Sequence, residues 1–353
     1  MVNNIETKIL GGLVGFAIGD ALGVPIEFTP RKKDNPLTEM VGFGSHSVPA
    51  GTWSDDTSMT IAAMDSICEN RSIDYDDIMN RFCKWAKDAK YTATGVVFDI
   101  GIGTRNALNS YYNGRTQAIF SGGKDERNNG NGSLMRMLPI VFYLYYNNIS
   151  EKDAVDTINM YSSLTHGHDI SKLGCNIYYD FMKSLLDGKS IEESYYSLSN
   201  KDYTKYFDKS IVEKYDRILN GNLVNCSIDD ISSSGYVVST LEASIWSLLK
   251  SNSYEEAVVK AINLGDDTDT VGAITGSMAG VFYGRDSIPE RWYKKLAKKE
   301  YLEFLAKDFL NTLLSRNISG HMSDDMGINH NLELYRILTS SKAVDVEKDN
   351  NKK

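Results

Sequence analysis

The strongest indication of the fold is the segment Gly265-Asp266-Asp267-Thr268-Asp269-Thr270-Val271-Gly272, in which an acidic cluster leads directly into a row of small residues. Gly272 is followed by Gly276 and Gly280, and the spacing i, i+4, i+8 places all three on one face of a helix. Glycines at such positions let another helix approach closely, so we interpret them as close-packing residues that bring scaffold elements together without contacting a ligand. The same spacing occurs near the N-terminus, at Gly11, Gly15 and Gly19.

Helical periodicity dominates the rest of the chain, which contains only 6 prolines and few runs of alternating β-branched residues. Apolar stripes at helical spacing occur in 61–68 and 237–249, and 254–259 and Arg291 to Leu314 are also expected to be helical. The expected fold class is therefore all-α, a compact orthogonal multi-helix bundle.

No segment of the sequence resembles an interdomain linker. We expect one domain over residues 1–320, with a polar, tyrosine-rich variable insertion at 188–232. Residues 321–353 form a C-terminal extension, and its charged end is expected to be disordered. Glycine and asparagine clusters predict loops at 42–51, 122–132 and 220–225.

Composition excludes several classes of protein. The net charge of −9 and a pI near 5.2 argue against nucleic-acid binding, since no basic patch dominates. The cysteines are scattered without a C-x-x-C pair, which favours free thiols in a reducing compartment. The apolar stretch Ile9–Pro25 lacks a basic leader, contains Asp20 and is shorter than the ~20 residues of a membrane span. We expect a buried helix there and a cytoplasmic, monomeric protein that does not bind membranes.

Another acidic segment lies about two hundred residues nearer the N-terminus, at Gly51-Thr52-Trp53-Ser54-Asp55-Asp56-Thr57-Ser58-Met59. We call 51–59 the first acidic segment and 265–270 the second. Asp55 and Asp56 stand where a helix begins, so capping is the alternative interpretation of that segment. In the later segment, Asp267, Asp269 and Thr270 exceed what a cap needs, and clustered carboxylates repel one another unless a cation neutralises them. Carboxylates and hydroxyls are the ligands that hard divalent cations prefer, so the two segments together could hold two Mg²⁺ or Mn²⁺ ions.

Over roughly residues 5–300, the sequence resembles the ADP-ribosylglycohydrolases, because seven motifs occur in the order seen in that family. The resemblance is strongest to the branch of the dinitrogenase-reductase-activating glycohydrolase. They are Gly15-x3-Gly19-Asp20-Ala21-Leu22-Gly23-x3-Glu27, the segment 51–59, Phe98-Asp99-Ile100-Gly101, Asn131-Gly132-Ser133-Leu134-Met135-Arg136, Thr165-His166, Ser234-Gly235-Tyr236-Val237-Val238 and Gly265-x-Asp267-Thr268-Asp269-Thr270.

The resemblance implies an all-α fold with a dinuclear metal cleft. Asp266 replaces a glycine expected at that position and adds a charge near the site. Ile102 stands where the branch often has asparagine. The metal ligands carried over by the match are Ser54, Asp55, Asp56, Asp267, Asp269 and Thr270.

The resemblance also implies which residues line the substrate cleft. Glu27 matches a mobile glutamate near the metals, and Asp99 matches an acid that faces the scissile ribose. From the residues alone, Glu27 could equally lie on the surface and Asp99 could cap a helix.

The remaining matches concern the nucleotide. The turn Asn131-Gly132-Ser133 could offer backbone N–H groups to phosphate oxygens, or could simply cap a helix from Leu134. His166 and Tyr236 match substrate contacts, although a lone histidine is more often structural and Tyr236 could be a core aromatic.

The reaction that the resemblance implies is hydrolysis of the bond between C1″ of ADP-ribose and a protein side chain, and arginine is the side chain we expect. The metals would orient the ribose and activate water, and Glu27, Asp56 and Asp99 are the candidate acid and base. The expected partner is a mono-ADP-ribosylated protein, and an ADP-ribosyltransferase or its target is a further candidate. The alternatives are a hydrolase of serine-linked or O-acetyl-ADP-ribose, and a non-catalytic ADP-ribose-binding or transferase-blocking protein.

Overall fold

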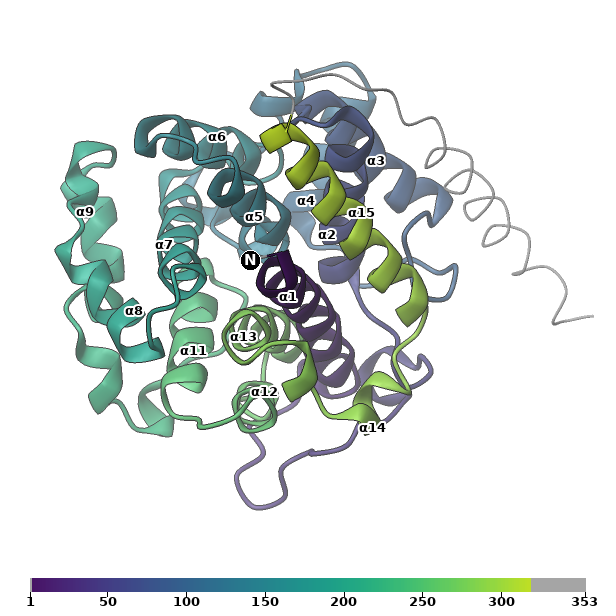
Figure 1. Cartoon of the computed structure of the whole chain (residues 1–353), viewed down its shortest axis with the longest axis vertical. Helices are drawn as coiled ribbons and strands as arrows, with labels where there is room; N and C mark the ends of the chain where they lie inside the picture. The colour runs from purple at the N-terminus through teal and green to yellow at the C-terminus, as the bar shows by residue number, and fades with distance from the viewer. Residues whose placement is uncertain (1, 319–353) are drawn as a thin grey trace, which may run out of the picture. The chain divides into compact units, whose positions relative to one another are not determined.

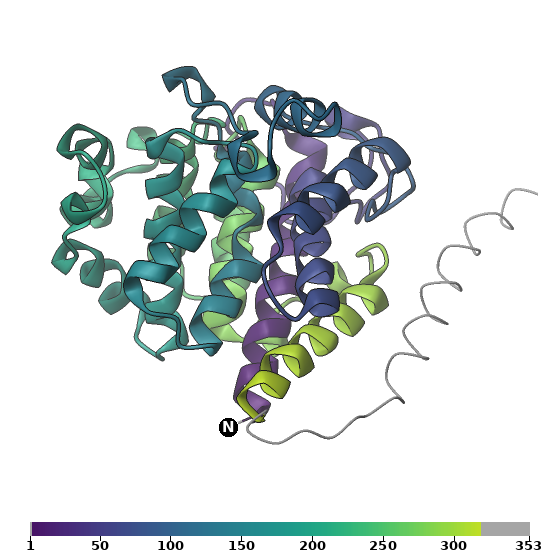
Figure 2. The same cartoon turned by 90° about the horizontal axis from the view of Figure 1, so that it is seen from above.

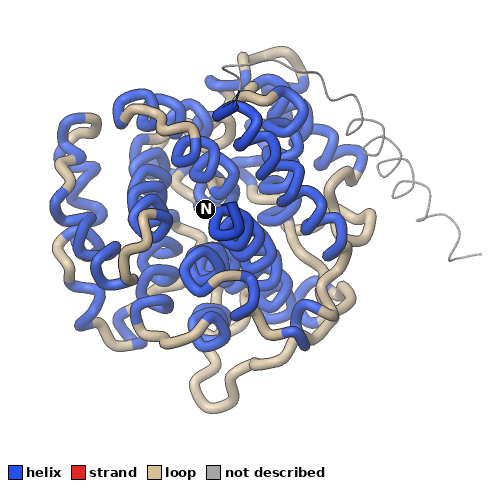
Figure 3. The backbone as a smooth tube through the Cα atoms, viewed as in Figure 1, coloured by secondary structure: helices blue, strands red, loops and turns tan. Residues whose placement is uncertain are grey.

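A computed structural model describes residues 2–318, and within that range helices are the only regular elements (Figures 1 and 3). The all-α expectation is confirmed. The α-helices are α1 (Val2–Gly23), α2 (Asp55–Asn70), α3 (Tyr75–Asp88), α4 (Ile102–Tyr112), α5 (Leu138–Tyr146), α6 (Glu151–Ser163), α7 (Asp169–Leu186), α8 (Ile191–Ser197), α9 (Lys209–Val212), α10 (Asp216–Leu219), α11 (Val237–Leu249), α12 (Tyr254–Ile262), α13 (Thr268–Tyr283), α14 (Glu290–Tyr293) and α15 (Lys299–Ile318).

The centre of the fold is the pair α1 and α13, which make the most extensive helix–helix contact and lie side by side in Figure 1. The glycine ridges predicted from the sequence face each other. A Cβ added at Gly19 would lie 2.0 Å from the carbonyl oxygen of Gly272, and one at Gly276 would lie 2.2 Å from that of Gly15. Only glycine permits this approach, because real Cβ atoms do not come so close to backbone oxygen.

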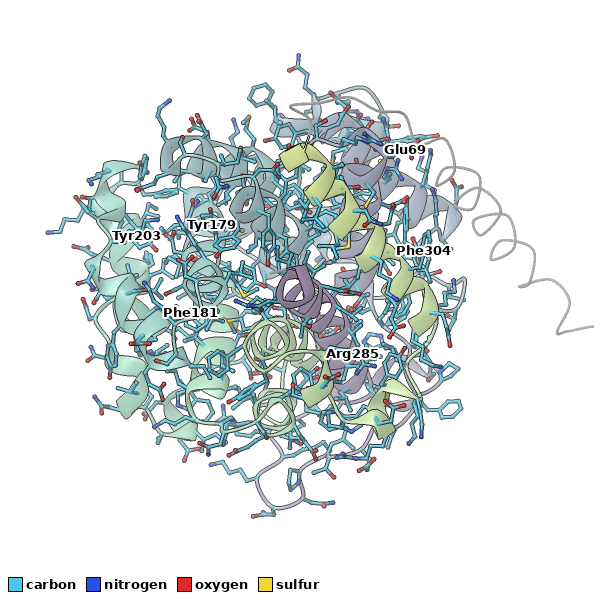
Figure 4. The ribbon with its side chains drawn as sticks, in the orientation of Figure 1. Glu69, Tyr179, Phe181, Tyr203, Arg285 and Phe304 are labelled. Atoms are coloured by element: carbon cyan, nitrogen blue, oxygen red, sulfur yellow. The ribbon has the colours of Figure 1, made fainter. Side chains whose placement is uncertain are left out.

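Other helices surround this pair. Helices α11 and α12 pack on α13, α7 packs on α11, and α2 packs on α3 (Figures 1 and 2). Side chains fill the space between the helices, as Figure 4 shows, and Phe181 of α7 is fully buried. Residues Met1–Leu313 form one compact unit, and a second unit begins at Leu314, within α15.

The N-terminal apolar stretch is a core helix. Asn4–Ile26 is long and apolar enough to cross a membrane by length and composition, yet 94% of its most apolar window is buried in the fold. Burial against α13 accounts for its apolar character.

Two expectations about helices are wrong in detail. The helix expected from Arg291 to Leu314 is two helices, α14 and α15, because the chain turns at Lys298, where φ is 43°. This turn meets the first acidic segment, since the N–H of Ala297 donates to the Gly51 carbonyl at 3.0 Å. The helix expected from Leu134 begins at Leu138 instead, after a 3-10 segment over Asn131–Arg136.

The segment 188–232, interpreted as an insertion, contains α8 to α10 and several single 3-10 turns. Its variability among relatives stays a prediction. The predicted boundary at residue 320 and the extension 321–353 lie outside the described residues.

Candidate metal centre and active site

The first acidic segment forms the N-terminus of α2. Ser54 is the N-cap, and its hydroxyl accepts from the N–H of Asp56 at 3.3 Å. Asp55 and Asp56 therefore occupy the first helical turn, where the helix dipole favours negative charge. Neither carboxylate is needed as the cap, because Ser54 fills that position.

Asp20 of α1 holds this segment in place through hydrogen bonds. Its buried carboxylate accepts from the N–H of Ser54 at 2.9 Å and from the N–H and hydroxyl of Thr57 at 3.0 and 2.6 Å. No role for Asp20 was predicted from the sequence. The available signal was its position as the single carboxylate within the apolar stretch Ile9–Pro25.

The second acidic segment forms the N-terminus of α13 and meets the first. The Thr270 hydroxyl donates to the Asp56 carboxylate at 3.3 Å, although the two residues are 214 apart in sequence. The Thr268 hydroxyl donates to the Gly23 carbonyl at 2.9 Å, and a Cβ on Gly23 would lie 2.4 Å from the Cα of Asp269. The close packing of α1 against α13 thus places both segments in one cluster.

The clustered carboxylates are buried. The pKa values of Asp55, Asp56 and Asp269 are raised well above the usual range, first by burial and then by neighbouring carboxylates. One oxygen each of Asp56 and Asp269 is buried without a hydrogen-bond partner. Among residues 2–318, no Lys or Arg forms an ion pair with these acids. Orphaned, mutually repelling carboxylate oxygens fit a divalent cation, which would neutralise them.

Glu27 and Asp99 border this cluster. One ligand atom each from Glu27, Asp267 and Asp269 lies within 4.8 Å of the others, and the same holds for Glu27, His46 and Asp99. Glu27 is only 3% exposed, which excludes the surface alternative. Burial, and next the charge of Asp99, raise the pKa of Glu27 to about 11.

Asp99 does not cap a helix. Helix α4 begins at Ile102 with Gly101 as its N-cap, and Asp99 has a φ of 53°. Non-glycine residues rarely adopt this left-handed conformation, and such strain concentrates at functional sites.

His46 is a neighbour of Glu27 that the sequence analysis missed. Its Nε2 hydrogen-bonds the Glu27 carboxylate, and its ring lies between Phe28 and Phe98, with centroids at 6.0 and 5.0 Å. Nothing in the sequence pattern singles out this histidine, since it lies in a loop expected from glycines alone.

The turn at 131–133 is joined to the acidic cluster. The Asn131 side chain donates to Asp267 at 2.9 Å and to the Thr240 hydroxyl at 3.0 Å, and its backbone N–H donates to the Gly235 carbonyl at 3.0 Å. Ser133 is fully buried. Asn131 thus positions a carboxylate of the acidic cluster, and its own backbone N–H already has an acceptor.

His166 and Tyr236 differ in exposure. His166 is 4% exposed, and atoms of its ring approach Gly103, Gly130 and Gly132. Tyr236 is the N-cap of α11 and is 38% exposed, so it is not a core aromatic. Gly130 pairs with Tyr236 in an isolated bridge, which places both residues beside the same turn. Contact of either residue with a substrate stays a prediction.

A family model for the ADP-ribosylglycohydrolases matches residues 1–318. The chain belongs to the ADP-ribosylglycohydrolase family. Its members are hydrolases, so the resemblance drawn from the seven motifs is confirmed.

Curated relatives and a solved structure agree with this assignment. An ADP-ribosylarginine hydrolase, Tri1, from Pseudomonas putida is 33% identical over 85% of this chain and 77% of the relative. The ADP-ribosyl-[dinitrogen reductase] glycohydrolase of Rhodospirillum rubrum is 27% identical over 84% of this chain and 92% of its own. A solved ADP-ribosylglycohydrolase-related protein complex has a TM-score of 0.73 at 29% identity, covering 88% of this chain and 99% of the other.

Proposed function

We propose that this ADP-ribosylglycohydrolase is a metal-dependent enzyme that removes mono-ADP-ribose from arginine side chains of proteins. The observation that carries the proposal is the junction of the two acidic segments, marked by the hydrogen bond from Thr270 to Asp56. The similarity to an ADP-ribosylarginine hydrolase supports the arginine linkage.

The metal-binding residues we propose are those in the two N-terminal turns of α2 and α13. Bound Mg²⁺ or Mn²⁺ would supply Lewis acidity and a water of lowered pKa. The two-ion stoichiometry rests on the number of clustered carboxylates, which exceeds what one cation needs for neutrality. The ligands are Ser54, Asp55, Asp56, Asp267, Asp269 and Thr270.

The chain's own residues define where the substrate guanidinium can lie. Asp99 is half-buried beside Glu27, so it can accept hydrogen bonds from a planar cation at the edge of the cluster. His46 holds the Glu27 carboxylate, which keeps that group next to Asp99 and Asp267. Glu27, Asp56 and Asp99 are the candidates for proton transfer, and the acid and base are not assigned among them.

Exposed apolar residues border this cluster, which favours a protein over a small molecule as the substrate. Phe28 follows Glu27, Phe43 lies in the loop of His46, and Ile102 begins the helix after Asp99. They are 69%, 66% and 77% exposed. Large exposed apolar side chains around a site are typical of surfaces that contact another protein.

The same acidic cluster would also support two alternative functions, namely hydrolysis of serine-linked ADP-ribose and hydrolysis of O-acetyl-ADP-ribose. A non-catalytic reader of ADP-ribose is disfavoured, because binding alone does not need this many buried carboxylates. We further propose a cytoplasmic monomer that acts on mono-ADP-ribosylated proteins without binding nucleic acid or membranes.

The test is release of ADP-ribose from arginine-modified protein, serine-modified peptide and O-acetyl-ADP-ribose, each with Mg²⁺, Mn²⁺ or a chelator. The proposal expects fast, metal-dependent release from arginine and much slower release from serine. Release from serine at an equal or greater rate would overturn the arginine assignment, and full activity with chelator would overturn the metal dependence.

A further inference from the structure

Arg136 is a fully buried guanidinium without a carboxylate partner among residues 2–318. It lies between two aromatic rings, with its central carbon 5.0 Å from the centroid of Phe82 and 4.3 Å from that of Tyr161. One nitrogen, Nη1, is buried without a hydrogen-bond partner. An unpaired buried charge is costly, so its presence calls for a reason beyond packing.

The other nitrogens of Arg136 connect the 131–136 turn to His166. Nε donates to the Gly132 carbonyl at 3.2 Å, and Nη2 donates to the Tyr161 carbonyl at 3.2 Å and to the Thr165 hydroxyl at 2.8 Å. The Thr165 oxygen lies 2.9 Å from Nδ1 of His166.

The donors and acceptors in the hydrogen bonds from Arg136 through Thr165 to His166 can be assigned from their chemistry. A guanidinium only donates, so the Thr165 oxygen must accept from Arg136 and has one proton left to donate. Thr165 is fully buried, and His166 Nδ1 is its one other side-chain partner in the described structure. If Nδ1 carried a proton, the hydroxyl proton would be buried without an acceptor, which costs free energy.

The ring of His166 is therefore neutral, with its proton on Nε2. In agreement, burial and then the charge of Arg136 lower the pKa of His166 to about 3. The backbone of His166 is held in place as well, since the backbone N–H of His166 donates to the Ser162 carbonyl at 2.8 Å.

Three glycines lie against the Nε2 side of the His166 ring. A Cβ at Gly103 or Gly130 would lie 3.3 or 3.4 Å from Nε2, and one at Gly132 would lie 2.7 Å from the adjacent ring carbon. Within residues 2–318, no protein group accepts a hydrogen bond from Nε2. The donor is thus available to an acceptor on a bound ligand.

We propose that Arg136, acting through Thr165, fixes His166 as the Nε2–H tautomer and so presents a hydrogen-bond donor to an oxygen of the bound nucleotide. Arg136 and Thr165 are positioning residues. The nucleotide part of this proposal rests on the proposed function, whereas the tautomer does not.

The test combines the spectrum of the free protein with the affinity for ADP-ribose. Two-bond ¹H–¹⁵N correlation on histidine-labelled full-length protein reports the tautomer, and His166→Gln assigns the signal. We expect Nε2–H with Nδ1 as a hydrogen-bonded acceptor. Thr165→Val should shift the Nδ1 signal, mix the tautomers and weaken ADP-ribose binding about tenfold, as expected for a displaced hydrogen bond. Thr165→Ser, which keeps the hydroxyl, should restore both.

The matched control is Thr275→Val, which removes a buried threonine hydroxyl in the middle of α13 and should leave the His166 signal and the affinity unchanged. A wild-type spectrum with the proton on Nδ1, or with both nitrogens protonated, would overturn the proposal even if Thr165→Val does not fold. An unaltered spectrum and affinity in a folded Thr165→Val protein would also overturn it. Because the spectrum is recorded without nucleotide, it stands whether or not the protein cleaves ADP-ribosylarginine.

Discussion

At the scale of single residues, the Asp269 carboxylate combines a proposed role as a metal ligand with unfavourable burial. Its carboxylate is fully buried and has one oxygen without a partner. Asp269→Ala should reduce hydrolysis about a hundredfold or more, because the proposed metal ligand is lost, while helix content by circular dichroism is unchanged.

The matched comparison is Asp269→Asn, which keeps the shape and removes the charge. Without metal, this variant should unfold at a temperature no lower than the wild type, since a repelling carboxylate is gone. Full activity in either variant would contradict the assignment of Asp269 as a ligand.

Asp99 is expected to affect cleavage of the bond to arginine more than binding of the ADP-ribose nucleotide. Asp99→Asn should lower kcat on arginine-modified protein by about ten- to a thousandfold, while ADP-ribose affinity changes less than about threefold, because the amide cannot balance the guanidinium charge. Parallel kinetics and calorimetry would check this. An affinity loss as large as the loss in kcat would place Asp99 in nucleotide binding instead.

At the scale of elements, the glycine contact between α1 and α13 is the link between fold and site. Gly276→Ala places a Cβ 2.2 Å from the Gly15 carbonyl oxygen, so the helices must separate. We expect a loss of about 1–3 kcal/mol in the free energy of unfolding by urea denaturation, together with weaker metal binding. Gly101→Ala is the control, since the nearest atom to its added Cβ is 4.0 Å away. Equal stability of the two variants would contradict the close-packing account.

Helix patterns also show what sequence can and cannot predict here. Helical periodicity and the acidic turns of α2 and α13 are local patterns, so the fold class and the proposed carboxylate ligands could be inferred from them, whereas Ser54 was carried over by the family resemblance. The break at Lys298 could not, because it depends on docking against Gly51. The same holds for His46 and Arg136, whose roles arise from partners distant in sequence.

At the scale of the whole molecule, the buried acids predict how stability depends on pH. Burial raises the pKa of Asp20 to about 6 and of Glu27 to about 11, and raises those of Asp55, Asp56 and Asp269. Above about pH 4, where these acids lose their protons in the unfolded chain, the folded protein without metal keeps more protons bound. Its stability therefore falls as the pH rises from about 4 through the raised pKa values of the folded protein.

The melting temperature of chelator-treated protein should accordingly fall between pH 5 and pH 8, by roughly 2–4 °C for each kcal/mol lost. Mn²⁺ should raise it more at pH 8 than at pH 5, because cations bind the deprotonated acids. A scanning calorimetry series at both pH values checks this, and Asp269→Asn should show a shallower dependence. Equal melting temperatures of the treated protein at both pH values would contradict the account.

Anomalous scattering from crystals soaked in Mn²⁺ would locate the proposed metal ions directly. We expect two peaks ~3.5–4 Å apart, ringed by Asp55, Asp56, Asp267 and Asp269 where the turns of α2 and α13 meet. Mn²⁺ peaks elsewhere, with these four carboxylates free of metal, would contradict this expectation.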